Sequence, residues 1–305
     1  IIIHHNPTMS GTIDTSTSVN LQPNDRLRSR EPLQSDGLAD FIQETLALTK
    51  RLFIQLQRRP STLIAGIVQP LMWLVLFGAL FQNAPKGMMG NDLSYGQFLG
   101  AGLIVFTAFV GALNAGLPVM FDREFGFLNR LLVAPLASRY SIVAASAIYI
   151  VALSFVQTAA IIGVNALMGA GLPSIAGLGI IALIILLLVL GVTALSLGFT
   201  FALPGHIELI AVIFVINLPL LFASTALAPL TFMPSWLQMV ASLNPLTYAI
   251  EPIRYLYNHP QWDLSSIVLQ APWGSVSFGT SLLILVGFAA FTLTAIQPLL
   301  KRRLA

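Results

Sequence analysis

The chain has 305 residues, of which 56% are hydrophobic and only 9% are charged, and its mean hydropathy is +0.83. Soluble domains carry roughly 25% charged residues, so 15 basic and 12 acidic side chains cannot cover the surface of a soluble protein of this length. A disordered chain is also excluded, because it needs low hydrophobicity and high charge. We therefore predict an all-α polytopic membrane protein, and the absence of Cys excludes disulfides and thiolate chemistry.

Residues 1–37 are polar and rich in Ser, Thr, Asn and Pro, a composition that predicts a disordered cytoplasmic tail. In residues 38–58, apolar side chains recur at helical spacing on one face, and charged and amide side chains fill the other. This pattern predicts an amphipathic helix in the cytoplasmic membrane interface. The helix is either a simple anchor or a docking surface for a cytoplasmic partner. The basic residues at its end are Lys50, Arg51, Arg58 and Arg59.

Long windows without Asp, Glu, Lys or Arg follow. A charge at the bilayer centre costs several kcal/mol, so the membrane spans are predicted inside these windows. Gly169, Gly171 and Pro173 divide the longest window into two helices, and Pro204 begins the break after the second of them. The transmembrane domain is predicted over 38–300, with 301–305 as a cytoplasmic C-terminus. Its six spans are expected at about 61–83, 96–120, 140–166, 175–203, 209–228 and 277–300.

The basic residues predict the orientation of these spans. If the N-terminus is cytoplasmic, the cytoplasmic segments hold 13 of the 15 Lys and Arg residues, and only Lys86 and Arg254 lie outside. Because basic residues concentrate on the cytoplasmic side, both termini are predicted to be cytoplasmic. The same bias explains the pI of 9.4 without nucleic-acid binding. A bacterial inner membrane is the expected location, with an organelle membrane as the alternative.

The loop 121–139 carries charges of both signs, which is unusual for this chain. Asp122, Arg123 and Glu124 are expected to start a short helix, because acids stabilise the positive N-terminal end of a helix. The Leu residues that follow give this helix an apolar side, and Pro135 ends it. We interpret the segment as a docking helix for a cytoplasmic partner, with a plain polar loop as the alternative.

The segment 229–276 lies outside in this topology and is too apolar for an ordinary loop. Four prolines divide it into pieces that are too short to cross the bilayer. One piece around Trp236 and another at about 246–257 are predicted to be re-entrant half-helices in the outer leaflet, with Trp and Tyr near head-group depth. Residues 258–276 are predicted to form a polar outer loop.

Sequence patterns for catalysis and metal binding are missing. There is no GxxxxGK[ST] phosphate loop and no HExxH or Ser-His-Asp pattern, and His206 and His259 stand apart from other ligand residues. The spans hold no ionisable residue, which argues against an ion-coupled carrier. We therefore expect no enzyme activity, metal or cofactor on this chain. The polar residues expected to hydrogen-bond between the spans are Asn114, Gln157, Asn165 and Asn217.

Two motifs stand at matching places in this topology. After the second span, Arg123-Glu124-Phe125-Gly126 is followed by Asn129-Arg130-Leu131-Leu132-Val133-Ala134-Pro135 and by Arg139. Before the last span, Pro234-Ser235-Trp236-Leu237 precedes Asn244-Pro245-Leu246-Thr247-Tyr248-Ala249 and Arg254. Over about 38–300 the chain resembles the ABC-2 type transporter permeases, and especially their daunorubicin-resistance and nodulation-factor branch. Asn129 departs from the family pattern, which frequently has Glu there.

The resemblance implies a permease subunit of an ATP-driven exporter, which moves an amphiphilic drug, lipid or glycan out of the cytoplasm. It also implies two cytoplasmic ATPase subunits that hold ATP and Mg²⁺, and a second permease copy, most simply in a homodimer. The interfacial helix would contact the ATPase, and the half-helices would close the outer side of the pathway. The implied ATPase-coupling residues are Arg123, Glu124, Gly126, Arg130, Leu131, Leu132 and Pro135. The implied residues of the outer re-entrant gate are Pro234, Trp236, Asn244, Pro245, Tyr248 and Arg254.

Two other functions stay open from the residues alone. One is a non-transporting membrane scaffold or assembly factor that binds partners through the loop 121–139. The other is an ion-independent channel. A neighbouring gene for a nucleotide-binding ATPase would favour the exporter over both.

Overall fold

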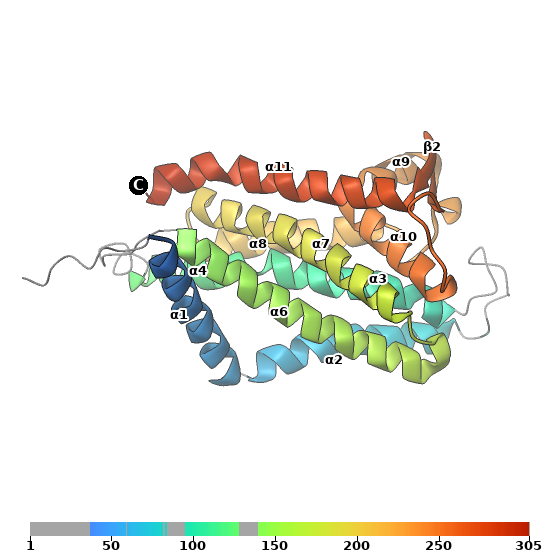
Figure 1. Ribbon diagram of the computed structural model, residues 1–305, viewed down its shortest axis with the longest axis horizontal. Coiled ribbons are helices and arrows are strands. Elements are labelled where there is room, and N and C mark those ends of the chain that lie inside the picture. The colour runs from blue at the N-terminus through green and yellow to red at the C-terminus, as the bar shows by residue number, and fades with distance from the viewer. Residues whose placement is uncertain (1–36, 59, 82, 84–94, 128–139, 305) are drawn as a thin grey trace, which may run out of the picture.

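In the computed structural model of the chain, the described residues are 37–58, 60–81, 83, 95–127 and 140–304. The chain is mostly helical, as predicted, and its long helices lie side by side in one bundle (Figure 1). The helices are α1 (Gly37–Arg58), α2 (Pro60–Leu80), α3 (Tyr95–Leu113), α4 (Gly116–Glu124), α6 (Tyr140–Asn165), α7 (Ile175–Ala202), α8 (His206–Phe222), α9 (Ser235–Leu243), α10 (Pro245–Asn258) and α11 (Phe278–Leu304). A π-helical turn spans Ala166–Ala170, and a 3-10 turn spans Leu230–Phe232.

Five helical segments of the described chain are long and apolar enough to cross a membrane. Their positions match five of the six predicted spans, and α3 and α4 together correspond to the second one. The five segments are Leu63–Leu80, Tyr95–Glu124, Tyr140–Gly169, Ile175–Ala202 and Phe278–Leu299.

The remaining predicted span, 209–228, corresponds to α8, which has 17 residues and ends at Phe222. At about 1.5 Å per residue, α8 is about 25 Å long, slightly less than the ~30 Å hydrocarbon core. It ends early because the Ser224 hydroxyl binds the local backbone, donating to Leu221 O at 2.6 Å and accepting from the Ala226 N–H at 3.3 Å. Whether α8 crosses the membrane therefore stays a prediction.

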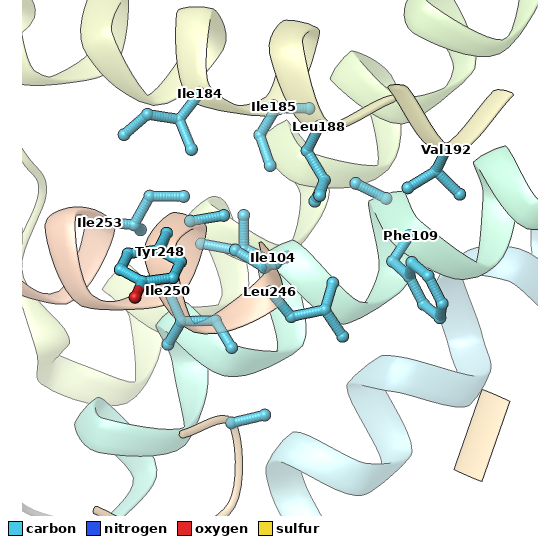
Figure 2. Close-up of a cluster of buried hydrophobic side chains, with 14 of the residues drawn as sticks. Ile104, Phe109, Ile184, Ile185, Leu188, Val192, Leu246, Tyr248, Ile250 and Ile253 are labelled. Carbon is cyan, nitrogen blue, oxygen red and sulfur yellow. The ribbon is translucent and has the colours of Figure 1, made fainter. Parts of the chain in front are cut away.

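A fully buried apolar cluster lies between α3, α7 and α10. Ile104 of α3, Ile184 and Leu188 of α7, and Leu246 and Ile253 of α10 meet there, each no more than 1% exposed (Figure 2). Two-thirds of the α3–α4 span is buried, whereas only 6% of the α2 span is buried. The centre of the bundle is thus set by α3 and α7, and α2 is peripheral.

A helix is present where the amphipathic interfacial helix was predicted: it is α1, which lies obliquely to the spans (Figure 1). It packs against α6, and the Phe53 ring meets the Tyr149 ring of α6 edge-on with centroids 5.3 Å apart. Thr45 and Thr49 are buried, and the Thr49 hydroxyl donates to Thr45 O at 2.7 Å. Leu38 remains 73% exposed, so part of the predicted apolar face is not covered by this chain.

The two ends of the bundle are built differently (Figure 1). One end, here called the junction end, holds α1, the end of α4 and the C-terminal end of α11. The other, the hairpin end, holds α9, α10 and an antiparallel pair of strands, β1 (Ile267–Ala271) and β2 (Gly274–Ser277). The strands replace part of the predicted polar loop 258–276, because Leu269 and Val276 pair across the hairpin and are both buried.

Candidate functional site

The charged triplet Asp122-Arg123-Glu124 forms the last turn of α4. The prediction that these residues start a new helix is therefore wrong. The apolar span continues through them, and the backbone then leaves the helix at Phe125, whose N–H donates to Phe121 O at 2.9 Å. Gly126 follows with φ of +74°, a left-handed conformation that favours glycine and ends helices.

Asp122 ties the end of α4 to the interfacial helix. The Arg51 guanidinium donates two hydrogen bonds to its carboxylate, at 2.8 and 2.9 Å. The same guanidinium lies 4.1 Å from the centre of the Phe127 ring. Because a bidentate Arg–carboxylate pair fixes both distance and orientation, α1 and α4 are held in one geometry here.

Arg123 ties the end of α4 to the end of α7. Its guanidinium donates to the backbone carbonyls of Thr200 at 2.6 Å, Leu203 at 2.7 Å and Pro204 at 2.5 Å. The last carbonyls of a helix lack partners within the helix and carry its negative end. A cation at this position therefore satisfies the C-terminus of α7.

Glu124 ties the end of α4 to the beginning of α8. Its carboxylate accepts a hydrogen bond from the His206 backbone N–H at 2.6 Å and contacts His206 Nδ1 at 2.5 Å. A carboxylate at a helix N-terminus is stabilised by the helix dipole, so the predicted effect occurs, but at α8 and not at a helix of its own. A Cβ on Gly205 would lie 2.9 Å from Glu124 Oε1, so glycine leaves room for the carboxylate.

The other predicted coupling and interfacial residues either have few contacts or lie outside the described part of the chain. No described atom lies within 4 Å of a Cβ added to Gly126, and its neighbour Phe125 is 80% exposed at the junction end. Lys50 and Arg58 are exposed, and of the basic residues described in α1 only Arg51 reaches the triplet. The predicted residues that lie outside the described part of the chain are Arg59, Arg130, Leu131, Leu132 and Pro135.

At the hairpin end, Asn244 and Pro245 form the start of α10. Asn244 Oδ1 accepts from the Leu246 N–H at 3.0 Å, and Pro245 occupies the first helical position, where its missing N–H costs nothing. Asn244 Nδ2 donates to Leu220 O at 2.8 Å and to Ala223 O at 2.5 Å. The Asn-Pro pair therefore begins one helix and holds the end of α8 at the same time.

The other predicted gate residues do not form one cluster with Asn244 and Pro245. The Tyr248 hydroxyl donates to Ser242 O at 2.6 Å and fastens α10 to α9. Pro234 precedes α9, and its carbonyl accepts the Leu237 N–H at 2.9 Å. Trp236 is 68% exposed and does not join this network.

Arg254 has a charged partner that sequence reasoning missed. Its Nη1 donates to the Glu251 carboxylate at 2.5 Å, and both side chains are at least 87% buried. The pair lines a cavity of about 510 Å³ between α10, β1 and the beginning of α3, together with Phe98, Tyr255 and both aliphatic and polar neighbours. The i,i+3 spacing of Glu251 and Arg254 on one helix is the signal that could have predicted this pair.

The polar residues predicted to hydrogen-bond between the spans differ from one another in their contacts. Asn114 Nδ2 donates to Val110 O within its own helical segment at 2.7 Å, so the predicted interhelical bond is wrong for Asn114. Gln157 Oε1 and Asn217 Oδ1 are buried without a partner among the described residues. Asn165 lies against α3, where a Cβ on Gly100 would come within 2.0 Å of its Nδ2. Within the described chain, no group of three His, Asp or Glu residues could hold a metal ion.

Comparisons with known proteins extend this description. The model of the ABC-2 type transporter family matches residues 43–258. The chain is 54% identical over 265 residues to the putative transport permease ycf38 of Porphyra purpurea, a match covering 87% of this chain and 91% of that protein. It is 55% identical over 261 residues to the putative transport permease ycf38 of Cyanophora paradoxa, covering 86% and 90%. It is also 27% identical over 253 residues to the probable doxorubicin resistance ABC transporter permease protein DrrC of Mycobacterium tuberculosis, covering 79% and 84%.

Proposed function

The chain belongs to the ABC-2 type transporter family, and on that premise we propose that it is the membrane-spanning permease subunit of an ATP-driven exporter. In this proposal, two cytoplasmic ATPase subunits hold the ATP and Mg²⁺, and a second copy of the permease completes the pathway. α8 is the sixth span, and the junction end and both termini face the cytoplasm. The complex lies in a bacterial inner membrane or an organelle membrane.

One observation supports the proposal most directly. Three consecutive side chains at the end of α4, Asp122, Arg123 and Glu124, hold α1, α7 and α8. Asp122 immediately precedes, and Arg123 and Glu124 begin, the stretch 123–135 that resembles the coupling helix of the family. An ATPase can drive transport only if the permease differs in free energy between the two states of the ATPase. A coupling segment joined to three helices gives the ATPase a direct route to the spans.

The cargo in this proposal is an amphiphilic drug, lipid or glycan. The spans are apolar, and α2 and α8 leave large apolar side chains such as Met72 and Phe214 uncovered by this chain. The name of the mycobacterial relative refers to doxorubicin resistance, which supports an amphiphilic drug as one cargo. At the outer side, α9 and α10 act as the gate, with Asn244 and Arg254 fixing the position of α10.

The proposal is tested by assembly with an ATPase encoded in the same genome, purified through a tag on this chain. We expect a stable complex whose ATP hydrolysis requires this chain. Phe125→Glu at the junction end should weaken the complex, whereas Leu264→Glu, which is also exposed but lies at the hairpin end, should leave it intact. An ATPase whose activity is indifferent to this chain, or that binds both variants equally, would contradict the proposal.

A further inference from the structure

Each of the three charged side chains at the end of α4 binds a different helix of this chain, which residues that only dock a partner need not do. We propose that Asp122, Arg123 and Glu124 are positioning residues that make α1, α7 and α8 move together with the end of α4. The proposal rests on the proposed function, because it describes how work done on the segment after α4 reaches the spans. It assigns the triplet to transmission within this chain and leaves contact with the ATPase to residues beyond it.

The helical geometry of the triplet supports this role. Consecutive helix residues point about 100° apart around the axis, so three in a row face three different neighbours. Asp122 faces Arg51 of α1, Arg123 faces the last carbonyls of α7, and Glu124 faces the first N–H of α8. The end of α4 cannot turn or shift without breaking one of these contacts or carrying its partner along.

The beginning of α4 is fastened as well. The Gly116 N–H donates to Ser196 Oγ at 2.9 Å, and the Gly116 carbonyl accepts from the Thr200 hydroxyl at 3.1 Å. A Cβ on Gly116 would lie 2.2 Å from Thr200 Oγ1 and 2.7 Å from Ser196 O, so glycine is required for this approach. α4 is therefore hydrogen-bonded to α7 at both of its ends. Asp122 and Glu124 link its C-terminal end to α1 and α8.

These links lie at the edge of the bundle. The side chains of Arg51 and Asp122 are 31% and 23% exposed, and those of His206 and Glu124 are 37% and 25% exposed. Ion pairs this accessible contribute little to folding stability, and the fold is held by the apolar core of α3, α7 and α10. Removing one link should therefore leave the protein folded and free one helix from α4.

The test measures transmission without needing the cargo. The chain has no Cys, so Thr231→Cys at the hairpin end gives a single site for a maleimide probe. In the complex with the ATPase, ATP with vanadate should change the labelling rate at this site at least threefold. Asp122→Ala and Glu124→Ala should each abolish that change while ATP hydrolysis stays within twofold of the wild-type complex.

Two controls separate positioning from folding and from local charge. Glu208→Ala removes another exposed acid from the first turn of α8, which lies near Glu124 but has no hydrogen bond to α4 among the described residues, and should respond like the wild type. The charge-swapped pair Arg51→Glu with Asp122→Arg should recover at least half of the labelling change that Asp122→Arg alone loses. Recovery by the swapped pair shows that the contact between residues 51 and 122 carries the effect, whereas no recovery assigns the loss to the local charge at position 122.

A second measurement needs no ATPase. Hydrogen exchange of the first turn of α8 should be at least fivefold faster in Glu124→Ala and unchanged in Glu208→Ala. Variants that label and exchange like the wild type, or that lose folding and ATP hydrolysis together, would overturn the inference. A wild-type complex that hydrolyses ATP with no change at Thr231→Cys would also overturn it. If the chain forms no complex with the ATPase, the proposed function is refuted. The hydrogen-exchange measurement then still tests whether Glu124 holds the first turn of α8.

Discussion

The guanidinium of Arg254 in α10 lies 3.7 Å from the centre of the Phe98 ring at the beginning of α3. Its Nη2 also donates to Thr225 O at 2.7 Å, and its Nη1 pairs with Glu251. One buried cation therefore joins α10, α3 and the turn after α8. The arrangement combines a cation–π contact with an ion pair whose two side chains are at least 87% buried.

Removing one member of this pair should destabilise the protein strongly. Arg254→Met leaves the Glu251 carboxylate buried without its partner, and breaking a buried ion pair costs about 3–5 kcal/mol. Glu251→Leu strands the guanidinium in the same way. We expect both single variants to unfold at clearly lower denaturant concentration than the wild type, measured on the purified protein in detergent.

The double variant Arg254→Met with Glu251→Leu is the matched control. Replacing both charges by apolar side chains removes the desolvation cost, so its stability should lie well above that of either single variant. Single variants that are as stable as the wild type would show that the pair does not hold α10.

Gly102 of α3 should not tolerate a side chain. A Cβ there would lie 2.4 Å from the Ala226 carbonyl oxygen and 2.7 Å from Ala226 Cα, and backbone atoms cannot move aside as a flexible side chain can. Gly102→Ala should therefore destabilise the protein by about 1–3 kcal/mol through overpacking. The measurement is again the unfolding midpoint in detergent.

Gly179 of α7 provides the comparison, because no atom of the described residues lies within 4 Å of its added Cβ. Gly179→Ala in a helix interior should stabilise the protein by up to roughly 1 kcal/mol. If Gly102→Ala and Gly179→Ala have the same effect, the close approach of α3 to the turn after α8 is not present in the folded protein.

The span predictions succeed where the physical signal is local. Charges are absent from four of the five long apolar segments and occur only in the last three residues of the fifth, because the bilayer excludes them, and that pattern can be counted directly from the sequence. The length of α8 was overestimated because hydropathy continues past Phe222. The helix ends there through hydrogen bonds of the Ser224 hydroxyl, which hydropathy does not describe.

The junction could be predicted only in part. The sequence indicated that Asp122, Arg123 and Glu124 matter, and that an acid would sit at a helix N-terminus. It could not indicate which helix, because the partners Arg51 and His206 lie 71 and 82 positions away along the chain. Such pairs depend on how the bundle packs, and a single sequence carries no local signal of them.

The six-span topology predicts which face of the membrane each end of α8 reaches. We expect Glu208→Cys, near the start of α8, to be labelled from the same side as Lys50→Cys in α1. Thr231→Cys, after α8, should be labelled from the opposite side, together with Gln261→Cys near the hairpin. All four positions are exposed, and the measurement is labelling by an impermeant maleimide before and after the membrane is permeabilised.

Labelling of Glu208→Cys and Thr231→Cys from the same side would show that α8 does not cross, leaving five spans. In that case the two termini would lie on opposite sides, and the distribution of the basic residues would need another explanation.

The central claim is that this chain moves an amphiphile only when a partner ATPase hydrolyses ATP. The most direct measurement is transport by proteoliposomes holding the complex, with doxorubicin and a fluorescent phospholipid as probes. We predict ATP-dependent movement of at least one probe, lost when the phosphate-loop lysine of the ATPase is replaced or when Glu124→Ala breaks the link to α8. Movement that is equal with and without ATP, or no movement of either probe by a complex that hydrolyses ATP, would contradict the account.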